Sequence, residues 1–551
     1  MKRLSFLILG IFLPAIIIPF KASAQNVCAD PVATAQGKVS GVSDAKDPVC
    51  VYKGIPFAAP PVGKLRWQPP QAPEKRTGIF KADKFSAECI QDDGPMPGVS
   101  ASPRSEDCLY LNIWRPNPAG RGTDKLPVMV WIHGGSLTSG SGVIPIYWGD
   151  RLASQKGVVV VTINYRLAWL GFLAHPDLSA EDPKASSGNY GLLDQIEALK
   201  WVKQNIASFG GDPNNVTIFG ESAGGWSVCN LLGSPLAAGL FAKAIIESGG
   251  CDMVSTLDQG YEIGKKFVKD AGCEFRDPIP CLRGKTPEEI QLALKAAKEK
   301  EKAEKQNEPK KKSGPMASAG GFDWIPHIDN WTLNATPIEA IRSGKFNQVP
   351  LLVGTNRDEG KLFSIEMPGI RSLPKGIVHS ALFSMLGGDT ASGIEKLYPY
   401  KNYRKPADAV IDALGDMGLG CKCFQAAQGV SKVEPVYYYR FDFDKHRFPH
   451  MIGAAHAVEI PFVFDSMDRP PASIVASKKQ AEKAKPLVDD MMGYWTNFAK
   501  TGDPNGGSLL PWPKYNTTDK QRMYLNLSPK VQATDNVDKC EFWSKHDLMK
   551  P

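Results

Sequence analysis

The sequence predicts an α/β fold in which a mainly parallel central sheet is flanked by helices. Apolar, β-branched runs recur along the chain, as expected for strands that are buried on both faces of a sheet; they span residues 128–132, 158–164, 216–219, 244–246, 351–353 and 436–443. Helix-compatible segments separate these runs. Between residues 191 and 207 the apolar side chains fall at helical spacing, which predicts a helix that packs on the sheet.

The N-terminus has the pattern of a signal peptide. Lys2 and Arg3 precede an apolar run over residues 4–20, and Ala22-Ser23-Ala24 then forms a small-residue cleavage site. An uncleaved membrane anchor is the alternative, but the run is short for a spanning helix and contains two prolines. We therefore predict a signal peptide over residues 1–24, a secreted or periplasmic mature chain, and no stable membrane span after cleavage.

Residues 25–551 are predicted to form one large domain. No Pro/Gly/Ser-rich linker divides them, and the 42% hydrophobic and 22% charged residues of the chain are typical of a globular protein. A charged insertion near residues 295–321 begins with mixed Lys and Glu and ends in small residues, which indicates a solvated helix and loop. Loss of residues 1–24 removes three positive charges and lowers the formal net charge from +7 to +4. That charge is too small to indicate a nucleic-acid partner.

The chain has eleven cysteines, a number that fits an exported protein in an oxidising compartment. Because the number is odd, at least one cysteine has no intramolecular partner. Local spacing suggests that Cys89 pairs with Cys108 and that Cys273 pairs with Cys281.

The motif Gly220-Glu221-Ser222-Ala223-Gly224 follows a short β-branched strand and precedes a helix-compatible segment. This context predicts a sharp turn that presents the Ser222 hydroxyl as a nucleophile, with the backbone N–H of Ala223 as an oxyanion donor. Upstream, residues 131–136 end another predicted strand in the glycine turn His133-Gly134-Gly135-Ser136. We expect that turn to supply the remaining oxyanion amides.

In a strand–turn–helix arrangement of this kind, the acid and the base follow the nucleophile in the chain. The strand at residues 351–353 is followed by Asp358 and Glu359, and either carboxylate qualifies as the acid. His456 follows the strand at residues 436–443 and is the candidate base. The seven other histidines lie in the glycine turn or among polar and turn residues.

Long sequence strings extend these motifs across the chain. They include residues 52–58, 106–112, 188–195, 209–213 and 456–464. On these strings and the serine motif, the chain resembles the type-B carboxylesterase and cholinesterase family of α/β-hydrolases. The resemblance covers nearly the whole mature chain. It implies an α/β-hydrolase fold with large loop and helical insertions.

The resemblance also implies roles for individual residues. It selects Glu359 over Asp358 and implies a catalytic triad of Ser222, Glu359 and His456, oxyanion amides at Gly135, Ser136 and Ala223, and buried polar supports at Glu221 and Ser227. At position 136 this chain has serine where relatives usually have glycine or alanine. The resemblance further implies an ion pair between Arg66 and Glu106 and disulfides that join Cys28 to Cys50 and Cys540 to either Cys421 or Cys423.

Together these features predict an exported serine hydrolase that cleaves small-molecule carboxylic esters through an acyl-enzyme, without a cofactor or metal. The loop between Cys89 and Cys108 contains no aromatic residue to hold a quaternary ammonium group, which argues against a choline ester. A non-catalytic binding module is the alternative of another class, but all three triad residues are present. A thioesterase or amidase with the same residues is a closer alternative. The sequence does not indicate the acyl or alcohol specificity or the oligomeric state.

Overall fold

The computed structural model of the chain describes most of the region after the predicted signal peptide. The described residues are 27–92, 102–117, 125–274, 277–307, 323–365, 367 and 369–546. The predicted signal peptide at residues 1–24 lies outside them, as does the second half of the charged insertion.

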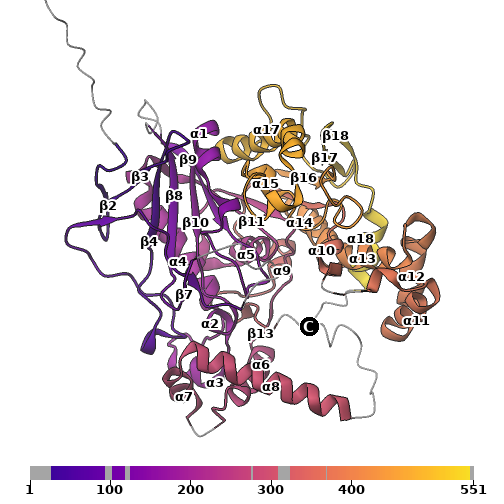
Figure 1. Cartoon of the computed structure of the whole chain (residues 1–551), viewed down its shortest axis with the longest axis horizontal. Coiled ribbons are helices and arrows are strands. Elements are labelled where there is room, and N and C mark those ends of the chain that lie inside the picture. The colour runs from indigo at the N-terminus through magenta and orange to yellow at the C-terminus, as the bar shows by residue number, and fades with distance from the viewer. Residues whose placement is uncertain are drawn as a thin grey trace, which may run out of the picture.

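The fold is built on a large mixed sheet (Figure 1). Its strand order across the described residues is β18-β17-β16-β15-β12-β11-β9-β10-β8-β4-β3. In chain order the strands are β3 (Val42–Ser43), β4 (Val49–Pro56), β8 (Tyr110–Pro116), β9 (Leu126–Ile132), β10 (Val159–Ile163), β11 (Gly211–Glu221), β12 (Lys243–Glu247), β15 (Leu351–Asn356), β16 (Val436–Phe441), β17 (Gln521–Leu525) and β18 (Lys530–Ala533).

The centre of the sheet is parallel and its two edges are antiparallel. The neighbouring strands of the centre, which pair in parallel, are β10, β9, β11, β12, β15, β16 and β17. Strands β8, β4, β3 and β18 add to the two edges by antiparallel pairing. All six predicted runs are strands of the parallel part, so the prediction of a mainly parallel core is confirmed. The antiparallel edges were not predicted. Their strands carry polar residues such as Asn112 and Arg115 and therefore do not form continuous apolar runs.

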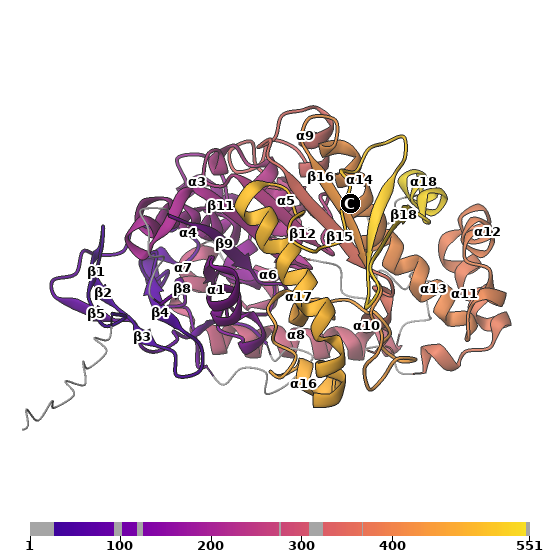
Figure 2. The ribbon, with the colours of Figure 1, turned by 90° about the horizontal axis from the view of Figure 1, so that it is seen from above.

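Helices cover both faces of the sheet (Figure 2). Side chains alternate along each strand, so Val130 of β9 belongs to one hydrophobic cluster and Trp131 to another. The first cluster includes α4 (Tyr190–Asn205) and α5 (Ala223–Gly233), and the second includes α17 (Lys478–Thr501). Helix α4 confirms the helix predicted between residues 191 and 207, and its last turn continues as a 3-10 helix.

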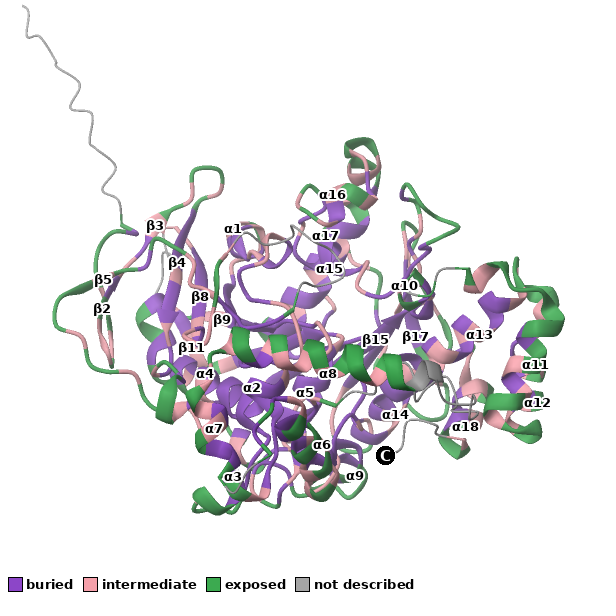
Figure 3. Cartoon of the chain, turned by 60° about the horizontal axis from the view of Figure 1, so that its bottom comes forward, coloured by how far each residue is buried: buried purple, intermediate pink, exposed green. Residues whose placement is uncertain are grey.

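The first half of the charged insertion is part of α8 (Pro287–Asn307), in agreement with the predicted solvated helix. Figure 3 shows α8 crossing one face of the molecule with much of its surface exposed. Helix α8 lies beside α6 (Leu257–Asp270) and α7 (Pro278–Gly284) (Figure 1). None of the described helices combines the length and the apolar character that crossing a bilayer requires.

Further helices extend the fold beyond the sheet. They are α1 (Asp150–Lys156), α2 (Ala168–Phe172), α3 (Pro176–Glu181), α9 (Pro337–Arg342), α10 (Gly360–Ile365), α11 (Lys375–Leu386), α12 (Gly388–Leu397), α13 (Pro406–Gly415), α14 (Cys421–Val430), α15 (Ile460–Val463), α16 (Ala472–Val475) and α18 (Val537–Lys545). Helices α11 and α12 form a projection at one end of the molecule (Figure 2).

Five disulfides cross-link the described chain. The pairs Cys89–Cys108, Cys273–Cys281 and Cys28–Cys50 agree with the predictions, and Arg66 Nε donates to Glu106 Oε2 at 2.6 Å as the resemblance implied. The structure also pairs Cys229 with Cys251, which was not predicted.

The structure decides between Cys421 and Cys423. Cys421 bonds Cys540 of α18, whereas Cys423 is free and buried, and its Sγ donates to the Gly249 carbonyl. Two residues apart on a helix, the side chains of positions 421 and 423 point in widely different directions, so only one of them faces α18.

Candidate active site

Ser222 lies on a sharp turn between β11 and α5. Its backbone has φ 58° and ψ −124°, and its N–H donates to the Glu247 carbonyl of the neighbouring strand at 2.9 Å. A Cβ at position 224 would lie 2.0 Å from the Ile132 carbonyl, so only glycine lets the helix start this close to β9. The turn therefore has the strained backbone that presents a serine side chain at the carboxyl end of the sheet.

The predicted glycine turn follows β9 and lies against this serine. A Cβ on Gly134 would lie 3.1 Å from the Ser222 Cβ. Gly135 has φ 109°, and its carbonyl accepts hydrogen bonds from the N–H groups of Thr138 and Ser139 at 3.0 Å. Ala223 is the first residue of α5, and the first N–H groups of a helix have no acceptor within it. The turn and the helix start are thus adjacent, as an oxyanion site requires.

Ser136, the residue that departs from the resemblance, has φ 56°. This left-handed conformation is costly for a residue with a side chain, but glycine adopts it freely. We expect Ser136→Gly to change the free energy of unfolding by no more than about 1 kcal/mol, because relief of strain offsets the greater entropy of the unfolded chain. Urea unfolding measures this change. Ester hydrolysis should stay within about threefold of wild type, because the backbone N–H is kept; a tenfold loss would show that the Ser136 side chain has a role of its own.

His456 and Glu359 form a buried pair. The histidine Nδ1 lies 2.7 Å from Glu359 Oε2. Glu359 follows β15, and its second oxygen, Oε1, accepts hydrogen bonds from Ser248 Oγ at 2.6 Å and from the Asn356 N–H at 2.7 Å. These donors fix the carboxylate, which in turn orients the imidazole.

Asp358, the alternative acid, points elsewhere. Its carboxylate pairs with Lys361 at 2.9 Å and Arg357 at 2.7 Å, and it accepts a hydrogen bond from the Ala454 N–H. Although burial opposes it, the charge of these two cations lowers the pKa of Asp358. Asp358 therefore supports the loop that carries the histidine, and of these two neighbouring acids it is Glu359 that contacts the imidazole.

The second ring nitrogen of His456, Nε2, lies next to the Glu221 carboxylate. His456 Nε2 lies 3.1 Å from Glu221 Oε1, and the Phe363 ring lies 5.2 Å from the imidazole between centroids. In the described chain no hydrogen bond joins Nε2 to Ser222 Oγ. Since Glu221 directly precedes Ser222, the imidazole lies beside the serine turn, and catalytic hydrogen bonds are often long or unformed before substrate binds.

Burial and charge shift the pKa values of these groups. Burial disfavours the imidazolium, but the Glu221 and Glu359 carboxylates outweigh it and raise the pKa of His456 to about 9. Burial also raises the pKa of Glu221 and raises that of Glu247 to about 8. Glu459, whose carboxyl accepts from the Asn356 amide, has a pKa well above its ordinary value for the same reason. Several buried carboxyl groups near the histidine thus titrate far above the usual acidic range.

Two further residues hold the site together, and sequence reasoning missed both. Ser248 anchors Glu359; it directly follows β12, so the carboxyl end of a predicted strand was the available signal. The Gln91 carboxamide donates to the Gly140 carbonyl at 2.9 Å and accepts from the Gly140 N–H at 2.8 Å. No sequence signal marks Gln91. Ser227 is buried; its hydroxyl donates to the Ala223 carbonyl and accepts a hydrogen bond from the Gln195 amide.

Comparison with known proteins identifies the family. The family model described as "Carboxylesterase family" matches residues 29–543. The chain belongs to the carboxylesterase family. This carboxylesterase is 37% identical to the para-nitrobenzyl esterase of Bacillus subtilis (strain 168), over 92% of this chain and 97% of that protein. It is also 37% identical to the fumonisin B1 esterase of Sphingopyxis macrogoltabida, over 88% of this chain and 84% of that protein.

Solved structures agree with this assignment. A structure named thermophylic PNB esterase matches with a TM-score of 0.78 at 35% identity and covers 94% of this chain and 100% of that chain. The carboxylesterase therefore has the predicted α/β-hydrolase fold, and it is a carboxylic ester hydrolase of the serine hydrolase type. Among the described residues, no group of three or more His, Cys, Asp or Glu side chains is arranged to hold a metal ion.

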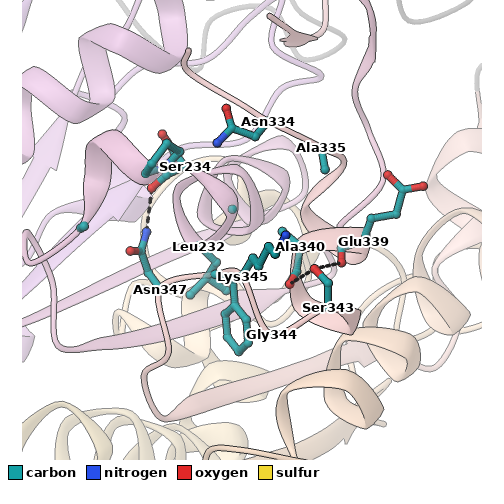
Figure 4. Close-up of a pocket in the computed structure, with 14 residues that line it drawn as sticks. Leu232, Ser234, Asn334, Ala335, Glu339, Ala340, Ser343, Gly344, Lys345 and Asn347 are labelled. Atoms are coloured by element: carbon teal, nitrogen blue, oxygen red, sulfur yellow. Dashed lines mark hydrogen bonds between the residues drawn. The ribbon is translucent and has the colours of Figure 1, made fainter. Parts of the chain in front are cut away.

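A cavity of about 760 Å³ lies away from these residues (Figure 4). It lies between the end of α5 and α9, and its lining includes none of the predicted site residues. Two of its polar side chains are engaged within the protein: the Asn347 amide donates to the Leu231 and Ser234 carbonyls, and Ser343 Oγ donates to the Glu339 carbonyl. Size alone therefore does not mark it as the catalytic centre.

Proposed function

We propose that this carboxylesterase hydrolyses carboxylic esters with Ser222 as nucleophile, His456 as general base and Glu359 as the carboxylate that orients the base. The observation that carries the proposal is the buried hydrogen bond of 2.7 Å between His456 Nδ1 and Glu359 Oε2, beside the turn that bears Ser222. An imidazole that is held by a carboxylate next to a serine is the arrangement that activates a hydroxyl for acyl transfer.

In the first step, His456 Nε2 takes the proton of Ser222 as Oγ attacks the ester carbonyl. The carbonyl oxygen becomes negative, and the N–H groups of Gly135, Ser136 and Ala223 donate hydrogen bonds to it. His456 then gives the proton to the alcohol oxygen, the ester C–O bond breaks, and the alcohol leaves. Ser222 is now acylated.

In the second step, water acts as the nucleophile in place of Ser222. His456 takes a proton from water, whose oxygen attacks the acyl carbonyl, and then returns a proton to Ser222 as the acid leaves. Nε2 contacts Glu221 in the free protein. Each proton transfer therefore requires the imidazole to exchange this contact for the hydroxyl.

A fluorophosphonate probe tests the proposal directly, because it bonds only to an activated serine. We expect one adduct per chain, located at Ser222 by peptide mass spectrometry, and concurrent loss of p-nitrophenyl acetate hydrolysis. A protein that takes no adduct while it keeps its fold would be a binding module. A matched panel of ester, thioester and amide substrates then separates an esterase from a thioesterase or amidase.

The carboxylates around His456 predict the pH dependence of hydrolysis. His456 acts as a base only when neutral, so kcat/KM should rise with pH up to about 9, the raised pKa. Glu221→Gln removes one of the two carboxylates that raise this pKa. We expect the rise in kcat/KM to move to lower pH by about one unit, since a nearby opposite charge shifts a pKa by that amount or more. A pH profile of kcat/KM measures the shift; a rise that stays in place or moves to higher pH contradicts the role given to Glu221.

We also propose that the protein is exported, after loss of residues 1–24, and that residues 25–551 form one catalytic domain. The five disulfides of the described chain support an oxidising compartment. N-terminal sequencing of the mature protein tests this proposal, with Gln25 expected as the first residue.

A further inference from the structure

The loop that carries the proposed acid is hydrogen-bonded to the loop that carries the proposed base (residues 454–459, the base loop). The Asp358 N–H donates to the Ala454 carbonyl at 2.9 Å, and the Ala454 N–H donates back to Asp358 Oδ2 at 2.8 Å. These two bonds end at residue 454, two residues before His456. They leave the segment between Ala454 and the imidazole to be fixed by other contacts.

The Asn356 side chain supplies such contacts. Its amide Nδ2 donates to the Ala455 carbonyl at 2.7 Å, and Ala455 directly precedes His456. The same Nδ2 donates to Glu459 Oε2, three residues after the histidine. Asn356 is buried, so bulk water does not compete for these bonds. Since a side-chain amide has two protons to donate, both of them hold the base loop, one on each side of His456.

The backbone of Asn356 holds the acid. Its N–H donates to Glu359 Oε1 at 2.7 Å, and Oε2 of the same carboxylate lies 2.7 Å from His456 Nδ1. Asn356 is the last residue of β15, which pairs in parallel with β12 and β16. The sheet therefore fixes the position of a single residue that bonds the acid through its main chain and the base loop through its side chain.

The base loop has a strained backbone that depends on such support. Ala457, the residue after His456, has φ 67°, a left-handed conformation that is costly for a residue with a side chain. A strained conformation persists only where the surrounding structure imposes it. The two bonds from Asn356 bracket Ala457, one at Ala455 and one at Glu459. Loss of the amide therefore frees the loop on both sides of the strained residue, and the imidazole moves with it.

We propose that Asn356 is a positioning residue of the catalytic centre, which aligns His456 with Glu359 by bonding the acid with its N–H and the base loop with its amide. The inference rests on the proposed function, because it assigns a role in the alignment of the same triad. Asn356 takes no part in the proton transfers. Its effect comes from alignment, and a displacement of about 1 Å in an active site can lower the rate by about 10²-fold.

The substitution Asn356→Ala tests the proposal, because it removes the amide and keeps the backbone N–H. We expect kcat for p-nitrophenyl acetate to fall by about 10²-fold, since the proton transfers depend on alignment. KM should stay within about threefold of wild type, because both bonds of the amide are to the base loop. Rates are expressed per site that a fluorophosphonate finally labels at Ser222, so that an unfolded fraction does not count.

The pH profile of kcat/KM separates alignment from stability. Burial lowers the pKa of His456, but the charge of Glu221 and the hydrogen bond and charge of Glu359 outweigh it and raise the pKa to about 9. An imidazole that moves away from Glu359 has a lower pKa. In Asn356→Ala the rise of kcat/KM should therefore move to lower pH, because His456 becomes neutral at lower pH. A side chain that only stabilises the fold would leave this rise in place.

Asn189→Ala is the matched control. Asn189 is also buried, and its amide donates to the His327 carbonyl and to Asp329 Oδ2, both at 2.9 Å. We expect both alanine substitutions to lower the unfolding temperature, because each leaves buried acceptors without their donor. In Asn189→Ala, however, kcat per labelled site should stay within about twofold of wild type and the pH profile should not move. Asn356→Leu, whose side chain has the same branched shape, repeats the test without leaving a cavity if Asn356→Ala does not fold.

Three results would overturn the inference. The first is a kcat per labelled site of Asn356→Ala within about threefold of wild type, and the second is a loss that lies in KM alone. The third is a fall in kcat with an unmoved pH profile, because His456 and Glu359 would then still be aligned. Failure of the proposed function looks different: wild type would take no fluorophosphonate at Ser222, or Ser222→Ala would hydrolyse the ester at the wild-type rate.

Discussion

Ser222→Ala is expected to lower kcat for p-nitrophenyl acetate by at least about 10⁴-fold, because alanine has no oxygen to attack the ester and no acyl-enzyme can form. Loss of a nucleophile leaves only the catalysis that comes from the oxyanion donors and substrate binding. The turn itself should persist, since its φ of 58° is imposed by the packing of β11 and α5 around it. Stopped-flow measurement should also show that any burst of p-nitrophenol disappears.

Ser234→Ala is the matched control for this substitution. Ser234 is buried, and its Oγ donates to the Thr332 carbonyl beside the cavity of Figure 4, away from the predicted site. We expect loss of about 1 kcal/mol in the free energy of unfolding and hydrolysis within twofold of wild type. If Ser222→Ala retained a tenth of wild-type activity, another residue would have to be the nucleophile.

Glu359→Gln is expected to lower kcat by about 10³- to 10⁴-fold while the protein stays folded. A neutral amide does not stabilise the imidazolium that forms when His456 takes the serine proton, and it can hold the wrong tautomer of the ring. The amide also disturbs the hydrogen bonds at Oε1, where Ser248 and the Asn356 N–H both donate. Steady-state kinetics well above pH 9, the raised pKa of His456, isolate the catalytic loss from the shift in pKa because the wild-type imidazole is then mostly neutral.

Asp358→Asn is the neighbouring control. It removes the ion pairs with Arg357 and Lys361 and should cost stability, but it leaves the contact between Glu359 and His456 intact. Thermal unfolding should therefore reveal the loss, whereas kcat should remain within about tenfold of wild type. Equal damage from Asp358→Asn and Glu359→Gln would mean that the acid has been assigned to the wrong carboxylate.

Local sequence was sufficient for the parallel core and for the turn at Ser222. A strand that is buried on both faces must be apolar along its whole length, so β9 to β12 are visible as continuous runs. Positions next to the serine require small residues because β9 passes so close to the turn. Gly224 meets this requirement and is visible in the sequence. The antiparallel edge strands carry no comparable local constraint.

Contacts between segments that are far apart in the sequence decided which carboxylate meets the histidine and which cysteine bonds Cys540. Asp358 and Glu359 are neighbours with the same charge, and only the positions of Lys361 and of the loop that bears His456 determine which carboxylate meets the imidazole. Likewise, Cys421 rather than Cys423 bonds Cys540 because α18 packs on one side of α14. Side chains that are close in the sequence can have the same chemistry and yet point in different directions. Which partner each of them meets is therefore determined only when segments a hundred residues apart pack together.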